Sequence, residues 1–122
     1  MTCVDLGNLE NIKNRNRIYD EGLYALIEGI YKSQSVLISE LHLKQASISG
    51  YGLQALAMLE NSSLQVLDLA NNDLGNEGAN YLKYVMQNLI SLNLANTKMG
   101  LRGCSDLCKT ITNDNRLRFL DL

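Results

Sequence analysis

The chain of 122 residues has no proline and one histidine, and its 11 basic and 13 acidic residues leave a net charge of −2. A chain without proline suits a succession of tight, regular turns better than domains joined by stiff linkers. Without a basic excess, nothing draws the chain to nucleic acid. No apolar run approaches 18 residues, so we expect no membrane span, and the first residues lack the apolar stretch of a signal peptide.

Cysteine is also scarce, with Cys3, Cys104 and Cys108 the only three. An odd, low count implies no disulfide framework. A metal site would need more ligands than these and the sole histidine, His42, so we expect no metal and no other cofactor. Cys104 and Cys108 are spaced for one side of a helix, and we expect both to be buried apolar thiols. Free thiols favour a reducing, cytoplasmic compartment.

A repeat dominates what the chain does contain. Segments that start at residues 38, 64, 89 and 117 carry apolar residues at the same offsets, and the starts are 26, 25 and 28 residues apart. The clearest copy, LQVLDLANNDLGNEG, spans 64–78 and combines Leu67, Leu69, Asn72 and Gly78. A degenerate earlier copy begins near Val4, and we interpret NLENIKNRNR (8–17) as a loop insertion within it.

These residues resemble the leucine-rich repeat family, with repeats of the ribonuclease-inhibitor type and the pattern LxxLxLxxNxLxxxGxxxL. The resemblance covers residues 36–122 well and 3–35 loosely, and Ala46 and Thr97 replace the asparagine in two copies. It implies an α/β solenoid, a short right-handed horseshoe of about 4.5 repeats, with parallel strands on the concave side and helices on the convex side. We expect one domain, 1–122, with a ragged first repeat (1–35), repeats 36–61, 62–87 and 88–115, and a terminal strand (116–122).

The mixed spacing has a physical reason within this fold. Leu67 and Leu69 are two residues apart because they point inward from one short strand. Asn72 lies where the chain leaves that strand, and its amide can satisfy backbone groups that no neighbouring strand reaches. Apolar residues then follow at helical spacing. We expect about five strands and four helices. The expected helix starts are Asp20, Ser49, Asn76 and Gly100. Glycines early in each helix, such as Gly78, should let helix and strand backbones approach closely.

The outward strand positions are free of the core pattern, so the binding information should lie there. They form an acidic and polar face with small residues at its centre. The predicted contact residues on the strands and on the turns that follow them are Asp5, Glu40, His42, Lys44, Val66, Asp68, Ala70, Asn71, Ser91, Asn93, Asn96, Phe119 and Asp121. The charges favour a partner protein with a basic or polar surface.

Two further features lie away from this face. The six tyrosines fall at helix starts or on helices, where we expect them to cover the outer core. The last strand, LRFLDL, leaves an uncovered parallel edge, which a longer chain, a partner or a second copy could cover.

The function that these patterns favour is protein binding without catalysis. His42 and Asp68 lie on adjacent strands and could pair, but Asn93 takes the place of a nucleophile on the next strand. The concave face would bind a partner protein, possible as an enzyme whose active site it occludes. The alternatives are an adaptor that recruits a client to an enzyme such as a ubiquitin ligase, and a structural cap that self-associates. The asparagine-rich repeats also resemble small leucine-rich effectors of intracellular bacteria such as Legionella, which would place the protein in a host cytoplasm.

Overall fold

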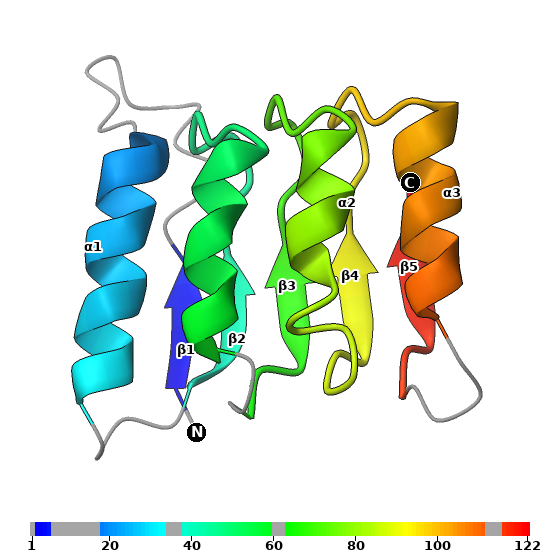
Figure 1. Cartoon of the computed structure of the whole chain (residues 1–122). Helices are drawn as coiled ribbons and strands as arrows, with labels where there is room; N and C mark the ends of the chain where they lie inside the picture. The colour runs from blue at the N-terminus through cyan, green and yellow to red at the C-terminus, as the bar shows by residue number, and fades with distance from the viewer. Residues whose placement is uncertain (1, 6–17, 34–37, 60–62, 112–115) are drawn as a thin grey trace.

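The structure is a computed structural model that describes residues 2–5, 18–33, 38–59, 63–111 and 116–122. For residues 2–5 it describes the backbone only. The loop insertion predicted at 8–17 lies outside these ranges. Within them, strands and helical segments alternate along the whole chain (Figure 1). Their bounds are β1 Thr2–Asp5, α1 Tyr19–Lys32, β2 Ile38–His42, η1 Tyr51–Leu59, β3 Val66–Asp68, α2 Glu77–Leu82, β4 Ser91–Asn93, α3 Leu101–Thr110 and β5 Phe119–Asp121.

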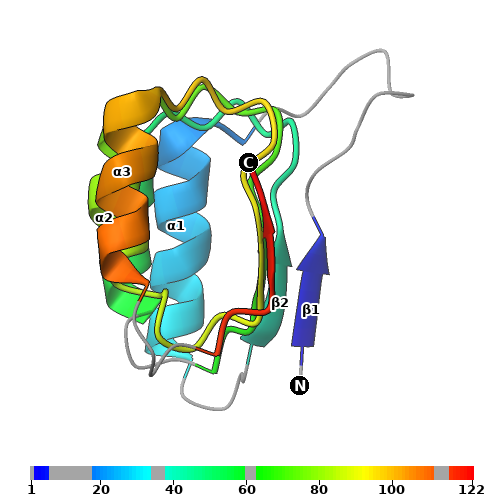
Figure 2. The same cartoon turned by 90° about the vertical axis from the view of Figure 1, so that its right-hand side faces the viewer.

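The strands form one parallel sheet in the order β1-β2-β3-β4-β5. All the helical segments lie on the same side of this sheet, and the opposite side is bare (Figures 1 and 2). A strand with its following turn and helical segment is called a coil below. The predicted alternation of parallel strands and helices is confirmed, whereas the horseshoe curvature and the count of about 4.5 repeats stay predictions.

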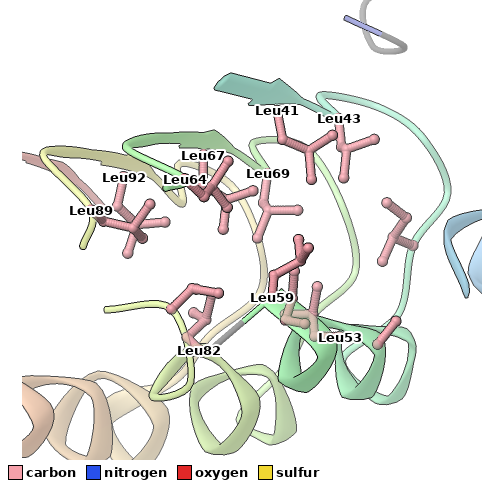
Figure 3. Packing of buried hydrophobic residues seen from close by; sticks show 14 of the residues in the cluster. Leu41, Leu43, Leu53, Leu59, Leu64, Leu67, Leu69, Leu82, Leu89 and Leu92 are labelled. Atoms are coloured by element: carbon pink, nitrogen blue, oxygen red, sulfur yellow. The ribbon is translucent and has the colours of Figure 1, made fainter. Parts of the chain in front are cut away.

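The core lies between the sheet and the helices and consists largely of leucine (Figure 3). Leu67 and Leu69 are both 0% exposed, as the two-residue spacing predicts for inward positions of one strand. Leu64 before the strand and Leu74 after it are also buried and close the ends of the coil. No coil could cover these side chains alone, so the leucines of one coil are buried by those of the next.

Asn72 joins two coils at the point where the chain leaves β3. Its side chain is buried, and Oδ1 accepts hydrogen bonds from the backbone N–H groups of Ala46 (3.0 Å) and Ile48 (3.1 Å) in the preceding coil. Its Nδ2 donates to the carbonyl oxygens of Leu43 (2.9 Å) and Leu69 (2.8 Å). The predicted role of Asn72 is therefore confirmed, and it satisfies backbone groups that the sheet ladder leaves without a partner.

Thr97 occupies the position of Asn72 in the next coil. Its hydroxyl donates to the carbonyl oxygen of Leu94 at 2.8 Å, the contact within the coil that corresponds to the one between Asn72 and Leu69. The backbone carbonyl of Thr97, rather than its side chain, accepts the bonds from Leu74 (3.0 Å) and Gly75 (3.1 Å) in the preceding coil. The shorter side chain keeps the local bond and leaves the bond between coils to the main chain.

Two helix starts are stabilised from the preceding coil rather than from within. The carboxylate of Asp20 accepts hydrogen bonds from the backbone N–H (2.8 Å) and the hydroxyl (2.5 Å) of Ser49. Asn76 Oδ1 accepts from the N–H groups of Gly100 (2.9 Å) and Gly103 (3.0 Å) at the start of α3. The predicted helix starts at Asn76 and Gly100 are confirmed, and those at Asp20 and Ser49 fall within two residues of the observed starts.

The glycines at the helix starts make room for these contacts, and the expectation that they bring helix and strand backbones together is wrong. A β-carbon on Gly103 would lie 2.8 Å from Asn76 Oδ1, and one on Gly52 would collide with the carboxylate of Asp20. One on Gly78 would lie 3.0 Å from the β-carbon of Leu74, which precedes the helix. The space is needed by the neighbouring side chains, not by a strand.

The expectation of two buried thiols on α3 is also wrong. Cys108 is exposed and Cys104 is half-buried, and both are free. The buried stripe of α3 consists of Gly103 and Leu107. Each cysteine follows one of these residues and is turned from it by about 100° around the helix, which takes it off the stripe.

The tyrosines cover the core only in part. Tyr81 is half-buried against the core, and its hydroxyl accepts a hydrogen bond from Gln54 Nε2 at 3.0 Å. The other side chains that were expected to cover the core are instead 49 to 62% exposed, namely Tyr19, Tyr24, Tyr31 and Tyr51. Leucine, isoleucine and alanine fill the inward helix positions, so these rings remain outside.

Replacing Asn72 with alanine should lower the free energy of unfolding by about 2–4 kcal/mol, because several buried backbone groups lose their partner. Urea unfolding followed by circular dichroism measures the change. Asn80→Ala is the matched control, since Asn80 is exposed on α2 and its replacement should change the value by less than about 0.5 kcal/mol. Equal losses in the two variants would contradict the bridging role of Asn72.

Candidate functional site

The bare side of the sheet is the candidate site, and we call it the open face. Its strand residues flank the buried leucines and point away from the helices (Figure 2). The described side chains of the open face are Glu40, His42, Val66, Asp68, Ser91, Asn93, Phe119 and Asp121. All of them are half-buried or exposed, while Leu41, Leu67 and Leu92 between them are at most 1% exposed.

Strand pairing arranges these positions in two rows that cross the sheet. One row passes through Cys3, Glu40, Val66, Ser91 and Phe119. The other passes through Asp5, His42, Asp68, Asn93 and Asp121. Both rows are as the sequence predicts. Residues from five coils that are distant in sequence thus lie at strand spacings of about 4.8 Å.

Asp68 and Asn93 are held in the same orientation by their own coils. Asp68 Oδ1 accepts a hydrogen bond from the N–H of Ala70 at 3.1 Å, and Asn93 Oδ1 accepts one from Ala95 at 3.0 Å. In each case the side chain reaches two residues ahead, to the point where the chain leaves the strand. The bond to Ala70 occupies only one carboxylate oxygen, so Asp68 presents a fixed negative charge near the centre of the sheet.

His42 interacts with the carboxylate of its own strand. His42 Nε2 lies 3.7 Å from Glu40 Oε1, and both side chains are partly exposed. Asp68, which the pairing places beside His42, turns toward Ala70 instead. The pairing of His42 with Asp68 that the sequence allows is therefore replaced by a loose contact with Glu40, beyond hydrogen-bond distance.

The turn residues at the ends of the strands contribute unequally. Asn96 Nδ2 donates to Asn71 Oδ1 at 3.0 Å, and both residues have a positive φ, of 54° and 59°. Asparagine tolerates this left-handed conformation better than most residues, so both turns suit their sequence. Lys44 is half-buried, but Ala70 is only 3% exposed and offers almost no surface.

Sequence reasoning missed two charged groups beside the open face. Arg118 lines a shallow depression together with Ser91, Phe119 and Asp121. Lys98 and Asp73 form an exposed ion pair of 3.1 Å between neighbouring turns. The repeat pattern assigns no role to either position; comparing equal offsets in adjacent coils would have revealed the opposite charges of the second pair.

In the ranges that the structure describes, no three histidine, cysteine or acidic residues lie close enough to hold a metal ion. The described helices are all too short or too polar to cross a membrane. What the open face presents, then, is a row of half-exposed polar side chains with one fixed carboxylate.

The segment around Asn72 decides the comparison with known proteins. It combines the buried leucine pair, the asparagine that bonds to the preceding coil and the helix that returns along the sheet. Residues 60–83 match the model of the family described as Leucine Rich repeat. The match contains β3, Asn72 and all of α2.

Curated relatives that carry such repeats in their names extend the similarity. Over 113 residues, or 88% of its length, the chain is 34% identical to the human NACHT, LRR and PYD domains-containing protein 5. The same share is 34% identical to protein 14 of that series from Mus musculus and 31% identical to the ribonuclease inhibitor of Sus scrofa. The chain spans only 9%, 11% and 25% of these three proteins, so it corresponds to a small part of each.

Because Asn93 already makes the backbone contact of Asp68 with an amide, Asp68→Asn should change the free energy of unfolding by less than about 0.5 kcal/mol. Asp68→Ala removes the acceptor and should cost about 1 kcal/mol. Chemical unfolding of both variants tests this. A loss with Asp68→Asn as large as with Asp68→Ala would mean that the charge, not the hydrogen bond, holds the turn.

Proposed function

We propose that the chain binds a partner protein through the open face and has no catalytic activity of its own. The observation that carries this proposal is the pair of rows on that face. They are in register over five strands, accessible, and not required by the leucine core. Leucine-rich repeats commonly present such a surface for binding another polypeptide.

The charges of the open face favour a partner with a basic surface. Glu40, Asp68 and Asp121 are acidic there, and Asp5 occupies the same row by strand pairing. Asp68 is held before any partner arrives, so its side chain loses little conformational freedom on binding. Complementary charge of this kind speeds association and selects among partners.

An apolar anchor lies at one end of the same face. Phe119 is 65% exposed, and the depression beside it is lined by Ser91, Asn93 and Asp121. Aromatic side chains are favoured at the centres of protein interfaces. A partner that presents lysine or arginine toward Asp68 and an apolar side chain toward Phe119 would satisfy both features. A face of this size could bury about 800 Å² on each partner, as standard interfaces do.

Binding could act in two ways. The name of the porcine relative describes an inhibitor of a ribonuclease, which supports the version in which this chain occludes the active site of a partner enzyme. The names of the other relatives place leucine-rich repeats beside further domains in longer proteins. That arrangement supports the alternative, an adaptor that brings a client to another activity.

The compartment also belongs to this proposal. We propose a reducing cytoplasm, because Cys104 and Cys108 remain free although one of them is exposed. Delivery by an intracellular bacterium into a host cytoplasm is the narrower version of this proposal. It rests only on the composition of the repeats.

A charge-neutral double variant tests the open face. Glu40→Gln with Asp68→Asn should weaken the capture of a basic partner at least about tenfold, because both changes keep the side-chain shape and remove the charge. The matched control is Glu28→Gln with Glu77→Gln, which removes two charges from α1 and α2 on the far side of the sheet. It should bind within about twofold of the unaltered chain.

Binding is measured by affinity capture, followed by titration of the captured protein by surface plasmon resonance at two salt concentrations. Equal loss in both double variants, or in neither, would remove the open face from the account. The activity of the captured protein, measured free and bound, then separates inhibitor from adaptor: occlusion abolishes turnover, whereas recruitment leaves it intact.

A further inference from the structure

The last coil exposes positions that every earlier coil buries. Leu120 of β5 is 37% exposed and Leu122 is 55% exposed. Their counterparts at equal offsets are at most 2% exposed, namely Leu41, Leu67 and Leu92 for the first and Leu43, Leu69 and Leu94 for the second. The difference has a simple cause, since β5 has a sheet neighbour on one side only.

The helix layer shows the same pattern at this end. Cys104 is half-buried, whereas its counterparts Leu23, Leu53 and Ala79 are at most 2% exposed. Leu101 is 92% exposed. Its counterparts Asp20, Gly50 and Asn76 all lie against the start of the next helical segment. We call these exposed positions, Leu101, Cys104, Leu120 and Leu122, the trailing face.

The opposite end of the chain is incomplete in the complementary way. Ala25 of α1 is exposed, although its counterpart Ala55 in η1 is only 2% exposed. A β-carbon on Gly29 would meet no atom within 4 Å, so the surface of α1 is open there as well. β1, like β5, has a single sheet neighbour. Ala25, Gly29 and the free edge of β1 form the leading face.

Opposite charges occupy equal offsets at the two ends. Arg102 directly precedes the helix glycine of α3, and Glu21 directly precedes that of α1. Lys109 follows the same glycine of α3 by six residues, and Glu28 follows that of α1 by six. Residues at equal offsets become neighbours when coils stack. Stacking α3 on a second α1 therefore places each basic residue beside an acidic one.

We propose that a second copy of this chain stacks its leading face on the trailing face, with β5 beside β1 of the next copy and α3 beside α1. This contact continues the interface between coils that the chain already makes three times, and it adds two opposite-charge pairs. A twofold-related pairing of two trailing faces would instead place Arg102 of one copy opposite Lys109 of the other. Like charges would then face each other, so the head-to-tail arrangement is the one that the charges favour.

Head-to-tail contact has a recognisable consequence for assembly. Each added copy leaves a new trailing face, so growth does not stop at a dimer unless the stack closes into a ring. The sheet also remains continuous, which covers the exposed edge of β5. The open face of one copy would run on into that of the next.

Sedimentation equilibrium on the 122-residue chain tests the proposal. The protomer mass is 13.6 kDa, and the mean mass should rise beyond twice this value as concentration increases. Raising sodium chloride from 50 to 500 mM should weaken association at least about threefold, because the exposed charge pairs are screened. A constant mass of one protomer at all concentrations would overturn the proposal.

Charge reversal tests the contact itself. Arg102→Glu with Lys109→Glu should weaken self-association at least about tenfold, and so should Glu21→Arg with Glu28→Lys. Mixing the two variants should restore it, since each end then meets its opposite charge. Lys83→Glu with Lys98→Glu is the control, because it reverses two exposed charges away from both end faces.

Circular dichroism verifies that each variant is folded. Undiminished association of the Arg102→Glu, Lys109→Glu variant would overturn the head-to-tail contact, and so would a mixture that fails to associate. If a variant does not fold, the concentration and salt dependence of the unaltered chain still decide the outcome.

Discussion

The burial of leucine by a neighbouring coil is the interaction on which the rest of this structure depends. A strand of three residues and a helix of six to fourteen cannot enclose Leu67 or Leu92 alone. Each such side chain leaves water only because the next coil repeats the same leucines in register. At about 25 cal/mol per Å² of apolar surface, this repeated burial is the main gain that offsets the ordering of short elements.

Register between coils also explains why polar groups at the joints are so fully used. Asn72, Asp20 and Asn76 each direct side-chain oxygens at backbone N–H groups of an adjacent coil. Among the described residues, no buried side-chain nitrogen or oxygen lacks a hydrogen-bond partner. The joints therefore fix how one coil sits on the next, and this in turn aligns the outward rows of the open face. A surface built in this way can vary in sequence without loss of the core.

Much of this arrangement is predictable from the sequence, for a physical reason. The leucine offsets identify which residues of each strand point inward, so the two outward rows follow from alternation alone, as do the strand order and the role of Asn72. Contacts that depend on the placement of one coil against another do not follow. Local spacing marks Asp20 and Asn76 as helix starts but does not tell that their oxygens serve the next coil. It places His42 beside Asp68 but not the turn of Asp68 toward Ala70. Cys108 was misassigned because a helical spacing of four names a side of the helix without saying whether that side is covered.

The register of the strands is the claim to test most directly, and disulfide formation between introduced cysteines measures it. With the three native cysteines replaced by serine, His42→Cys and Asp68→Cys form an in-register pair on neighbouring strands, about 4.8 Å apart and within the range of a disulfide. His42→Cys with Val66→Cys joins the same two strands out of register. The account predicts that the first pair oxidises at least about tenfold faster than the second. Equal rates, or faster oxidation of the second pair, would contradict it.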